Sequence, residues 1–213
     1  MEHDNLLSNM SKYHYTFANG NGLWVTSDIH MCHKNIIKYC SRPFQTVDDM
    51  DEQIIKNWNE VVKKNDTVFI IGDVGFGNVD KLCEKIKRLN GKKILIVGNH
   101  DRDYLANETF TSLFAAIHEQ VYIKVGDTKI YINHFPFTCF DGSYGGLSAT
   151  WKLFGHCHSF PGSLGMDMDR LGHLFPTQYD VGMDNNHYTP VSFERIQEII
   201  SEQQQSLNLI RKC

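Results

Sequence analysis

Short apolar segments alternate with longer segments of helical periodicity in the first half of this chain, and this alternation constrains the fold most. The apolar segments are 23–28, 67–72 and 93–98. Between them, residues 47–64 and 79–89 place apolar side chains every three or four positions, which is typical of helices with one buried face. Strands that alternate with helices pair in parallel, and the helices cross over the sheet. The first half therefore predicts an α/β fold.

The second half has a different pattern. Residues 121–125 and 128–133 are apolar segments on either side of Gly126-Asp127, which predicts a β-hairpin. No internal repeat or linker interrupts the sequence, so one domain is expected over residues 1–213. The remaining predicted elements are a short helix near 36–40, a strand at 151–155, a loop at 159–177 and a C-terminal helix from Val191 to Gln204 with Ser192 as its N-cap.

Composition excludes several classes of protein. The chain has 213 residues, of which 41% are hydrophobic and 22% charged, and this excludes a disordered or collagen-like chain. Its 21 Lys and Arg against 25 Asp and Glu give a net charge of −4. A protein that holds nucleic acid through charge alone needs an excess of basic residues. We therefore expect no large nucleic-acid footprint.

The location of the protein is inferred from its termini and cysteines. The N-terminus is polar and lacks a basic segment followed by an apolar one, so no secretion signal is expected. No apolar segment approaches the ~18 residues of a membrane span. The six cysteines contain no CxxC pair. We therefore predict reduced thiols, no membrane partner and a cytoplasmic location.

Metal-binding side chains follow five of the predicted strands. The chain has 11 histidines, and five of them fall in these segments. The segments are Asp28-Ile29-His30, Gly72-Asp73, Gly98-Asn99-His100-Asp101, Asn133-His134 and Gly155-His156-Cys157-His158. Sites in α/β folds form at the carboxyl ends of strands, so these segments are expected to meet. Carboxylate, imidazole and amide donors suit Mn, Fe, Zn, Co or Ni better than Ca, and they lack the thiolates of a structural zinc site.

The spacing within two of these segments favours a shared site. Asp28 and His30 are two residues apart, as are His156 and His158, and in extended chain such pairs point to the same side. Cys157 would then point away and pack in the core. A glycine before Asp73, Asn99 and His156 would allow a sharp turn and a close approach to an ion.

In this order, the five segments resemble the five motif blocks of the calcineurin-like metallophosphoesterases. The blocks span residues 28–158, and weaker similarity continues at 181–184 and 190–192. Small bacterial and phage-type members of the family carry stretches similar to His33-Lys34-Asn35-Ile36-Ile37 and Arg42-Pro43-Phe44. The resemblance implies a four-layer α/β/β/α sandwich with a two-metal centre.

The resemblance also implies a role for each matching residue. One metal would be held by Asp28, His30, Asp73 and His158, and the other by Asp73, Asn99, His134 and His156. Manganese is the first choice for both metals, with Fe, Zn, Ni or Co as alternatives. A metal-bridging hydroxide would attack phosphorus, and His100 would stabilise the transition state or protonate the leaving group. The acidic residue that orients this histidine in larger phosphatases has no match in residues 72–78.

Other polar residues near the blocks have two interpretations each. His33, Arg42 and Arg102 would bind the phosphate of the substrate, or would serve local structure only. The 159–177 loop, with Arg170 and His173, would cover the site or form an ordinary surface excursion. The remaining histidines are expected to be structural or on the surface: His3, His14, His118, His173 and His187.

Three functions follow from these expectations. The first is hydrolysis of monoesters or diesters of phosphate, with a small phosphorylated or nucleotide-like substrate. The second is a nuclease or other nucleic-acid phosphodiesterase, against which the net charge and the lack of a long basic segment argue. The third is a scaffold that uses the same fold without catalysis. Because all seven ligand positions and His100 are filled, the first is preferred.

Overall fold

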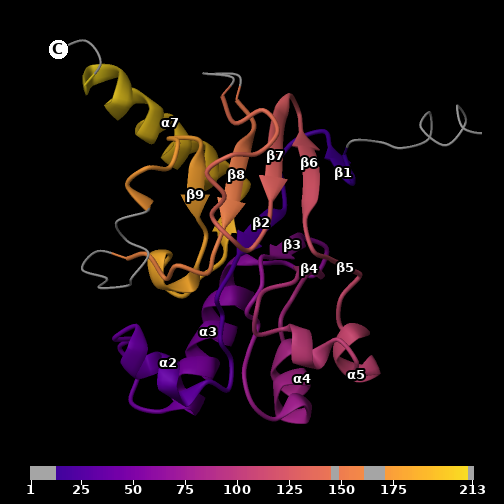
Figure 1. The fold of residues 1–213 in the computed structure, drawn as a ribbon. Coiled ribbons are helices and arrows are strands. Elements are labelled where there is room, and N and C mark those ends of the chain that lie inside the picture. The colour runs from indigo at the N-terminus through magenta and orange to yellow at the C-terminus, as the bar shows by residue number, and fades with distance from the viewer. Residues whose placement is uncertain (1–12, 145–148, 161–170, 211–213) are drawn as a thin grey trace, which may run out of the picture.

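The computed structural model describes residues 13–144, 149–160 and 171–210. Its framework is a pair of five-stranded sheets (Figure 1). The strand order is β10-β2-β3-β4-β5 in the first sheet and β1-β6-β7-β8-β9 in the second. The two sheets hold the strands expected from the first and the second half of the chain respectively.

The first sheet contains the three apolar segments as parallel neighbours. A fourth parallel strand extends it beyond β4, and an antiparallel one pairs with β2. The strands are β2 (Leu23–Thr26), β3 (Thr67–Ile70), β4 (Lys92–Ile96), β5 (Ala116–His118) and β10 (Val191–Ser192). β2, β3 and β4 each stop two residues before the end of the predicted segment, so the metal-binding side chains lie in the loops that follow.

Helices cover the outer face of this sheet (Figure 1). Trp58 and Leu82 from two of these helices are fully buried in one cluster with Ile70 of β3. Thr46 and Asn78 cap their helices by accepting backbone N–H groups, as small polar residues commonly do. The elements are α2 (Lys34–Tyr39), α3 (Val47–Val61), α4 (Val79–Lys87), the 3₁₀ helix η1 (Arg102–Tyr104) and α5 (Glu108–Thr111).

The second sheet contains the predicted hairpin, which pairs with Val125 opposite Thr128. Beyond the hairpin, β7, β8 and β9 run parallel to one another. The elements are β1 (Tyr15–Phe17), β6 (Val121–Val125), β7 (Thr128–Ile132), β8 (Trp151–Phe154), β9 (Gln178–Asp180) and the 3₁₀ helix η3 (Met183–Asn185). The outer face of this sheet carries Tyr131, against which the rings of Phe137 and Phe140 stack.

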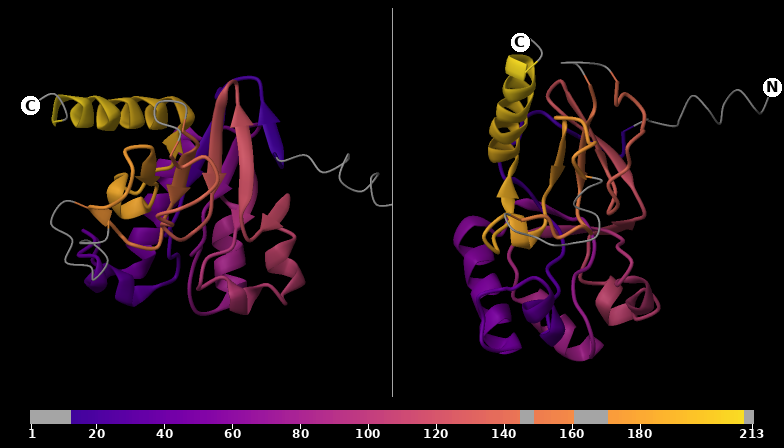
Figure 2. Two further views of the ribbon diagram at one scale, coloured as in Figure 1. Left: turned by 45° about the horizontal axis from the view of Figure 1, so that its top comes forward. Right: turned by 60° about the vertical axis from the view of Figure 1, so that its left-hand side comes forward.

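The two sheets share one apolar core. Val25 and Phe69 of the first sheet lie in the same buried cluster as Ile130 and Leu153 of the second. Ile196 of helix α7 (Phe193–Ile210) completes this cluster, and α7 lies on the opposite side of the molecule from α2, α3 and α4 (Figure 2). This arrangement confirms the α/β fold of the metallophosphoesterase type.

The C-terminal helix starts two residues later than predicted, because Val191 and Ser192 form β10. Ser192 is its N-cap as predicted, since its Oγ accepts the backbone N–H of Arg195 at 3.2 Å. The described residues of the predicted 159–177 loop precede β9, which begins at Gln178. Residues 161–170 of this loop, including Arg170, lie outside the described residues, and so does His3 near the N-terminus.

Two further expectations concern cysteines and membranes. The five described cysteines are free thiols, and Cys157 is buried as expected. Within the described part of the chain, we find no helix that is both long and apolar enough to span a membrane.

Candidate metal centre

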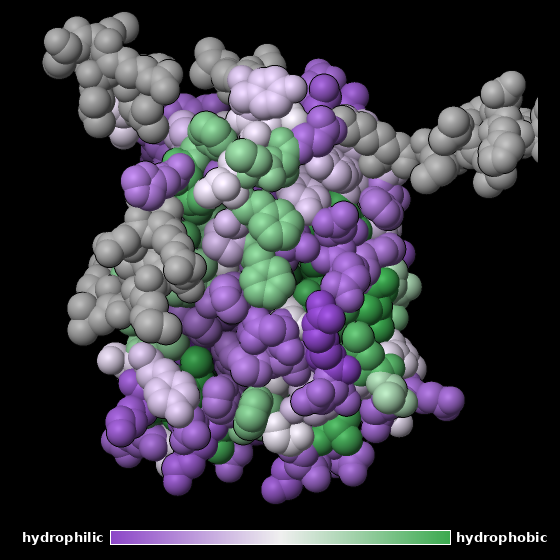
Figure 3. Space-filling view, viewed as in Figure 1, coloured by the Kyte–Doolittle hydropathy of each residue, from purple (hydrophilic) through white to green (hydrophobic). Residues whose placement is uncertain are grey.

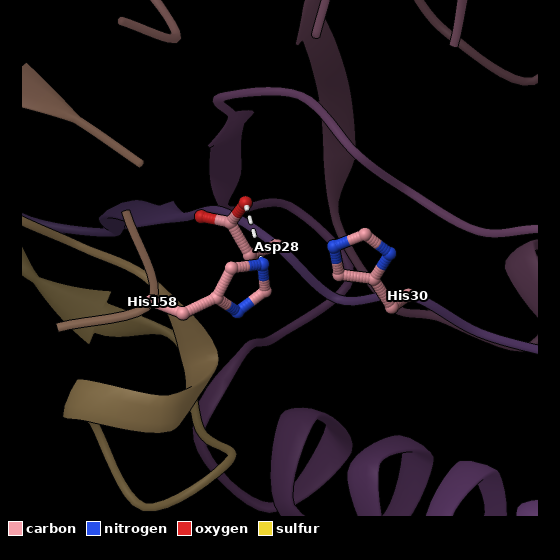
Figure 4. A group of neighbouring side chains, drawn as sticks. All are labelled: Asp28, His30 and His158. Carbon is pink, nitrogen blue, oxygen red and sulfur yellow. Dashed lines mark ion pairs between the residues drawn. The ribbon is translucent and has the colours of Figure 1, made fainter. Parts of the chain in front are cut away.

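The ends of parallel strands bring the predicted ligands to one place. In the first sheet β2, β3 and β4 are parallel neighbours, so the segments that follow them start at the same edge. In the second sheet β7 and β8 are parallel neighbours, which aligns His134 with the segment containing His156 and His158. Figure 4 shows His158 of the second sheet's segment facing Asp28 of the first.

Left-handed backbone, and not extended chain, points these side chains toward the centre. Five of the seven predicted ligands have positive φ angles between 48° and 71°: Asp28, His30, Asp73, His156 and His158. The expectation that strand alternation aligns each pair is therefore wrong. Residues other than glycine seldom adopt this conformation, and it costs about 1–3 kcal/mol per residue. Such strain concentrates at functional sites, where the surrounding structure enforces it.

Two glycines allow the loops to come close enough. A Cβ on Gly98 would lie 2.3 Å from Asp73 Oδ1, and a Cβ on Gly155 would lie 2.3 Å from Asp28 Oδ2. Both distances are far below van der Waals contact. Only glycine at these positions lets the backbone of one loop rest against a carboxylate of the next.

One group of donors contains Asp28, His30, Asp73 and His158. His30 Nε2 lies 3.7 Å from Asp73 Oδ2, and His158 Nε2 lies 3.8 Å from Asp28 Oδ1. His30 Nε2 is buried and has no hydrogen-bond partner in the described structure. A buried polar atom without a partner is costly. A cation held among these donors would satisfy it, so this group fits a metal ion.

The second group contains Asp73, Asn99, His134 and His156. His134 Nε2 lies 3.5 Å from Asp73 Oδ2 and 3.1 Å from Asn99 Oδ1. His156 Nδ1 lies 3.0 Å from the same Asn99 oxygen. Asp73 thus borders both groups, which is the geometry that a bridging carboxylate requires. The structure brings all seven predicted ligands together, although their role as ligands stays a prediction.

Charge in this cluster favours a cation. Burial alone would raise the pKa of Asp73, but hydrogen bonding and charge attraction from His134 and His30 hold it well below its ordinary value. Burial opposes protonation of His134, but its interactions with Asp73 and Asp28 outweigh this and raise its pKa to about 9. The carboxylates of Asp73 and Asp28 therefore favour a positive charge at this position.

A buried carboxylate that the sequence interpretation missed fixes two of the loops. Asp101 Oδ2 accepts the backbone N–H groups of Asp73 and Gly98 at 2.9 and 2.8 Å, and its Oδ1 accepts that of Val74 at 2.9 Å. The available signal was its place at the end of Gly98-Asn99-His100-Asp101. Asp101 ties the loop after β3 to the loop after β4.

A second buried carboxylate orients one ligand. Asp184 Oδ2 lies 2.7 Å from His158 Nδ1, which leaves Nε2 of the same ring directed toward Asp28. Carboxylates that hold the far nitrogen of a metal-binding histidine fix its orientation and raise its basicity. Burial would lower the pKa of His158, but hydrogen bonding to Asp184 and Cys40 and the charge of Asp28 outweigh this and raise it to about 11. The only signal in the sequence was the weak similarity at residues 181–184.

Arg42 supports this carboxylate and does not face the substrate. Its guanidinium donates to Asp184 Oδ1 and Oδ2 at 2.8 and 2.9 Å. It also donates to the backbone oxygens of Asp28 and Ile29 and to Met50 Sδ. These contacts use all five N–H groups of an arginine. The hypothesis that Arg42 binds phosphate is therefore wrong, and the alternative of a structural role holds.

The other candidate residues occupy three different positions. His100 donates its backbone N–H to Asp73 Oδ1 at 2.9 Å, while its side chain is 39% exposed. His33 is buried beside the first donor group, with its Nδ1 3.3 Å from His30 Nδ1. Arg102 is exposed and pairs with Glu119. His100 is thus the one of the three that combines contact with a predicted ligand and access from solvent.

Comparison with known proteins agrees with this geometry. The family model for calcineurin-like phosphoesterases matches residues 23–196. An uncharacterised protein of Methanocaldococcus jannaschii is 31% identical over 84% of this chain and 92% of its own length. The gene 66 protein of Mycobacterium phage L5 is 28% identical over 76% of this chain and 86% of its own length.

A solved structure from another organism has a similar fold. A protein of unknown function from Aquifex aeolicus superposes with a TM-score of 0.63 at 23% identity, covering 83% of this chain and 98% of that one. At this identity the likeness concerns the fold alone, whereas the family match covers most of the chain. The chain therefore belongs to the calcineurin-like phosphoesterase family, a family of metal-dependent hydrolases of phosphate esters.

Proposed function

We propose that this protein hydrolyses phosphate monoesters or diesters at a dinuclear metal centre. The observation that carries the proposal is the position of Asp73 Oδ2. It lies 3.7 Å from His30 Nε2 in one donor group and 3.5 Å from His134 Nε2 in the other. One carboxylate shared between two such groups is what a pair of bridged cations requires.

The donor set supports two divalent transition-metal ions, with manganese first and Fe, Zn, Ni or Co as alternatives. When bound, the ions would supply Lewis acidity and a water acidified enough to attack phosphorus near neutral pH. The proposed ligands are Asp28, His30, Asp73 and His158 for one ion, and Asp73, Asn99, His134 and His156 for the other.

His100 is proposed to act on the leaving group. Its backbone N–H is bound to Asp73 Oδ1, so its position is tied to the bridging carboxylate. Its imidazole lies on the open side of the cluster, with Nε2 4.0 Å from Asp73 Oδ2. An imidazole held there would donate a proton to the departing oxygen or stabilise the charge that develops on it.

The substrate is proposed to be a small phosphorylated or nucleotide-like molecule. The net charge of −4 supports this, because a long nucleic acid would need a broad basic surface. The proposal includes no membrane partner and a cytoplasmic location.

The test measures hydrolysis of an aryl phosphate monoester and an aryl phosphate diester with added Mn²⁺. Asp73→Asn and His134→Ala should each lower kcat/KM by about a thousandfold or more. The first variant changes the ligand proposed to be shared by both ions, and the second removes a ligand proposed for one of them. Circular dichroism should show that both variants are folded. Asp127→Asn, in the exposed hairpin turn, is the matched control and should keep wild-type activity. Full activity in either ligand variant would overturn the site assignment.

A substrate panel separates this proposal from its alternatives. The panel comprises nucleotides, cyclic nucleotides, dinucleoside polyphosphates and single-stranded nucleic acid, each with every candidate metal. Turnover of the small substrates supports the proposal, while turnover of nucleic acid alone would replace it with a nuclease. A purified protein that neither carries nor binds a transition metal would indicate a scaffold.

A further inference from the structure

Aromatic side chains border the metal centre beside His100. Phe76, in the loop between β3 and α4, is 45% exposed. Its ring centroid lies 5.8 Å from that of His100, and it stacks on His33 at 4.5 Å with an interplanar angle of 24°. The ring of Tyr39, which is more exposed still, is nearly perpendicular to that of His33, with 6.3 Å between the ring centroids. Figure 3 shows one face of the molecule, on which hydrophilic side chains gather near the middle and hydrophobic ones lie above and below them.

The Phe76 ring is held in place by its backbone. The N–H of Phe76 donates to Met31 O at 2.8 Å, and Gly75 fits against Leu82 where a Cβ would collide at 2.3 Å. On the other side, Gly77 takes a φ of 86° and its carbonyl accepts the hydroxyl of Tyr104 at 3.2 Å. The backbone on both sides of Phe76 is therefore fixed, and this places its exposed ring beside His100.

We propose that Phe76 is a stacking platform for a planar ring in the part of the substrate that leaves, so that the preferred substrates are phosphate esters of nucleosides or similar aromatic alcohols. This proposal rests on the proposed function, since it needs the phosphate to lie at the metal centre. His100 is the residue proposed to protonate the leaving oxygen, and Phe76 is the aromatic ring next to it. A leaving group that extends outward past His100 therefore meets Phe76.

The chemistry of this border favours a flat ring over an aliphatic or a charged group. One side of Phe76 is backed by the buried His33 ring, which fixes the plane of the phenyl group. Stacking of a base on an aromatic side chain contributes about 1–3 kcal/mol and needs no hydrogen bonds to the base. An aliphatic chain would gain burial there but would not be selected by the plane of the ring.

The test compares two substrates that differ only in the base, adenosine 5′-monophosphate and ribose 5-phosphate. Both release a primary 5′-hydroxyl, so the departing oxygen is the same. In the Mn²⁺-loaded protein, Phe76→Leu should lower kcat/KM for the nucleotide by about tenfold or more and leave that for ribose 5-phosphate within about twofold. Phe76→Trp should retain the preference. Phe175→Leu, at a residue 40% exposed, is the matched control and should change neither.

Binding gives a second readout that does not depend on turnover. Calorimetry on the metal-loaded protein would use the 5′-methylene phosphonate analogues of the same two compounds, which have no oxygen to release. Phe76→Leu should weaken binding of the nucleoside analogue alone by about tenfold. Equal effects on both analogues, or no effect on either, would overturn the platform. If neither phosphate ester is hydrolysed but the binding difference is seen, the proposed reaction fails and the platform stands.

Discussion

The two sheets hold their shares of the metal centre in different ways. In the first sheet the loops carrying Asp73 and Asn99 are tied together through backbone N–H groups, which Asp101 accepts. In the second sheet the histidines are oriented one by one. His134 Nδ1 lies 2.7 Å from the backbone oxygen of Ile71 in the first sheet, and His158 Nδ1 lies 2.7 Å from Asp184.

This difference predicts that changes in the first sheet's loops have larger effects than changes in the second sheet's loops. The ligands of the first sheet keep their places because their loops are fixed, so a change there should affect both metal positions and the fold. Those of the second sheet are each held by contacts of their own, and two of these contacts involve the first sheet: Ile71 O to His134, and the Asp28 carboxylate to the backbone N–H of His156. A change in one of these contacts should therefore weaken one metal position more than the other.

The largest expected effect comes from Asp101→Ala. The substitution leaves three buried backbone N–H groups without an acceptor, and at about 1–3 kcal/mol each the loss of unfolding free energy should be on the order of 5 kcal/mol. Metal binding at both positions should be lost with it. Urea unfolding of the metal-free protein and calorimetric titration with Mn²⁺ measure the two effects.

Two further variants guard this prediction. Asp101→Asn keeps one acceptor oxygen and should give an intermediate loss even if the alanine variant does not fold. Asp103→Ala removes an exposed carboxylate from the same turn and should change stability by less than about 0.5 kcal/mol. Wild-type stability in Asp101→Ala would show that the first sheet's loops do not depend on this carboxylate.

A smaller effect is expected from Asp184→Asn. It removes the carboxylate that orients His158, and loss of such an outer partner typically weakens metal affinity by about 10–100-fold. It also leaves the buried guanidinium of Arg42 without its charged partner, so the metal-free variant should itself be less stable than wild type. Metal binding stabilises the folded state. At the same saturating Mn²⁺ concentration, the variant should therefore gain up to about 2.7 kcal/mol less unfolding free energy than wild type does. Calorimetry gives the affinity, and thermal unfolding with and without Mn²⁺ gives the stabilisation.

Asp127→Asn again serves as the control, since its carboxylate is fully exposed in the hairpin turn. Unchanged Mn²⁺ affinity in Asp184→Asn would show that His158 is oriented without Asp184. A collapse of the whole fold would remove the contrast between the two sheets.

Much of this arrangement could be predicted from the sequence, because it follows from chain order. Each of the first three apolar segments forms a parallel strand, and the polar residues that follow meet at one edge. The strands that were missed, β1, β5, β9 and β10, are two or three residues long, which is too short for periodicity to show. They form because a neighbouring strand offers unpaired backbone groups.

The site was predictable in its residues but not in its supports. No pattern in the sequence shows that Asp28 and His30 adopt left-handed backbone, because only the packed loops enforce that conformation. Arg42 and Asp184 lie 142 positions apart, and their pairing decides that Arg42 is structural. Such roles depend on which groups the fold brings together, and one-dimensional spacing does not contain that information.

The smallest expected effect concerns the buried cation of the second sheet. Arg42 has a carboxylate partner, whereas the described partners of Lys152 Nζ are the backbone oxygens of Asn133 and Leu153 and the rings of Tyr131 and Phe137. Burial holds the pKa of Lys152 well below its ordinary value. At pH values above that lowered pKa and below the ordinary value of about 10.4, the unfolded chain binds a proton that the folded chain does not.

Raising the pH through this window should therefore stabilise the metal-free wild type relative to Lys152→Met. The unfolding free energy of wild type minus that of Lys152→Met should rise by up to about 1.4 kcal/mol per pH unit. Urea unfolding at pH 7, 8 and 9 in the presence of a chelator measures it. Lys129→Met, at an exposed position of β7, should show no such slope. Parallel stability profiles for wild type and Lys152→Met would mean that Lys152 keeps its proton when folded.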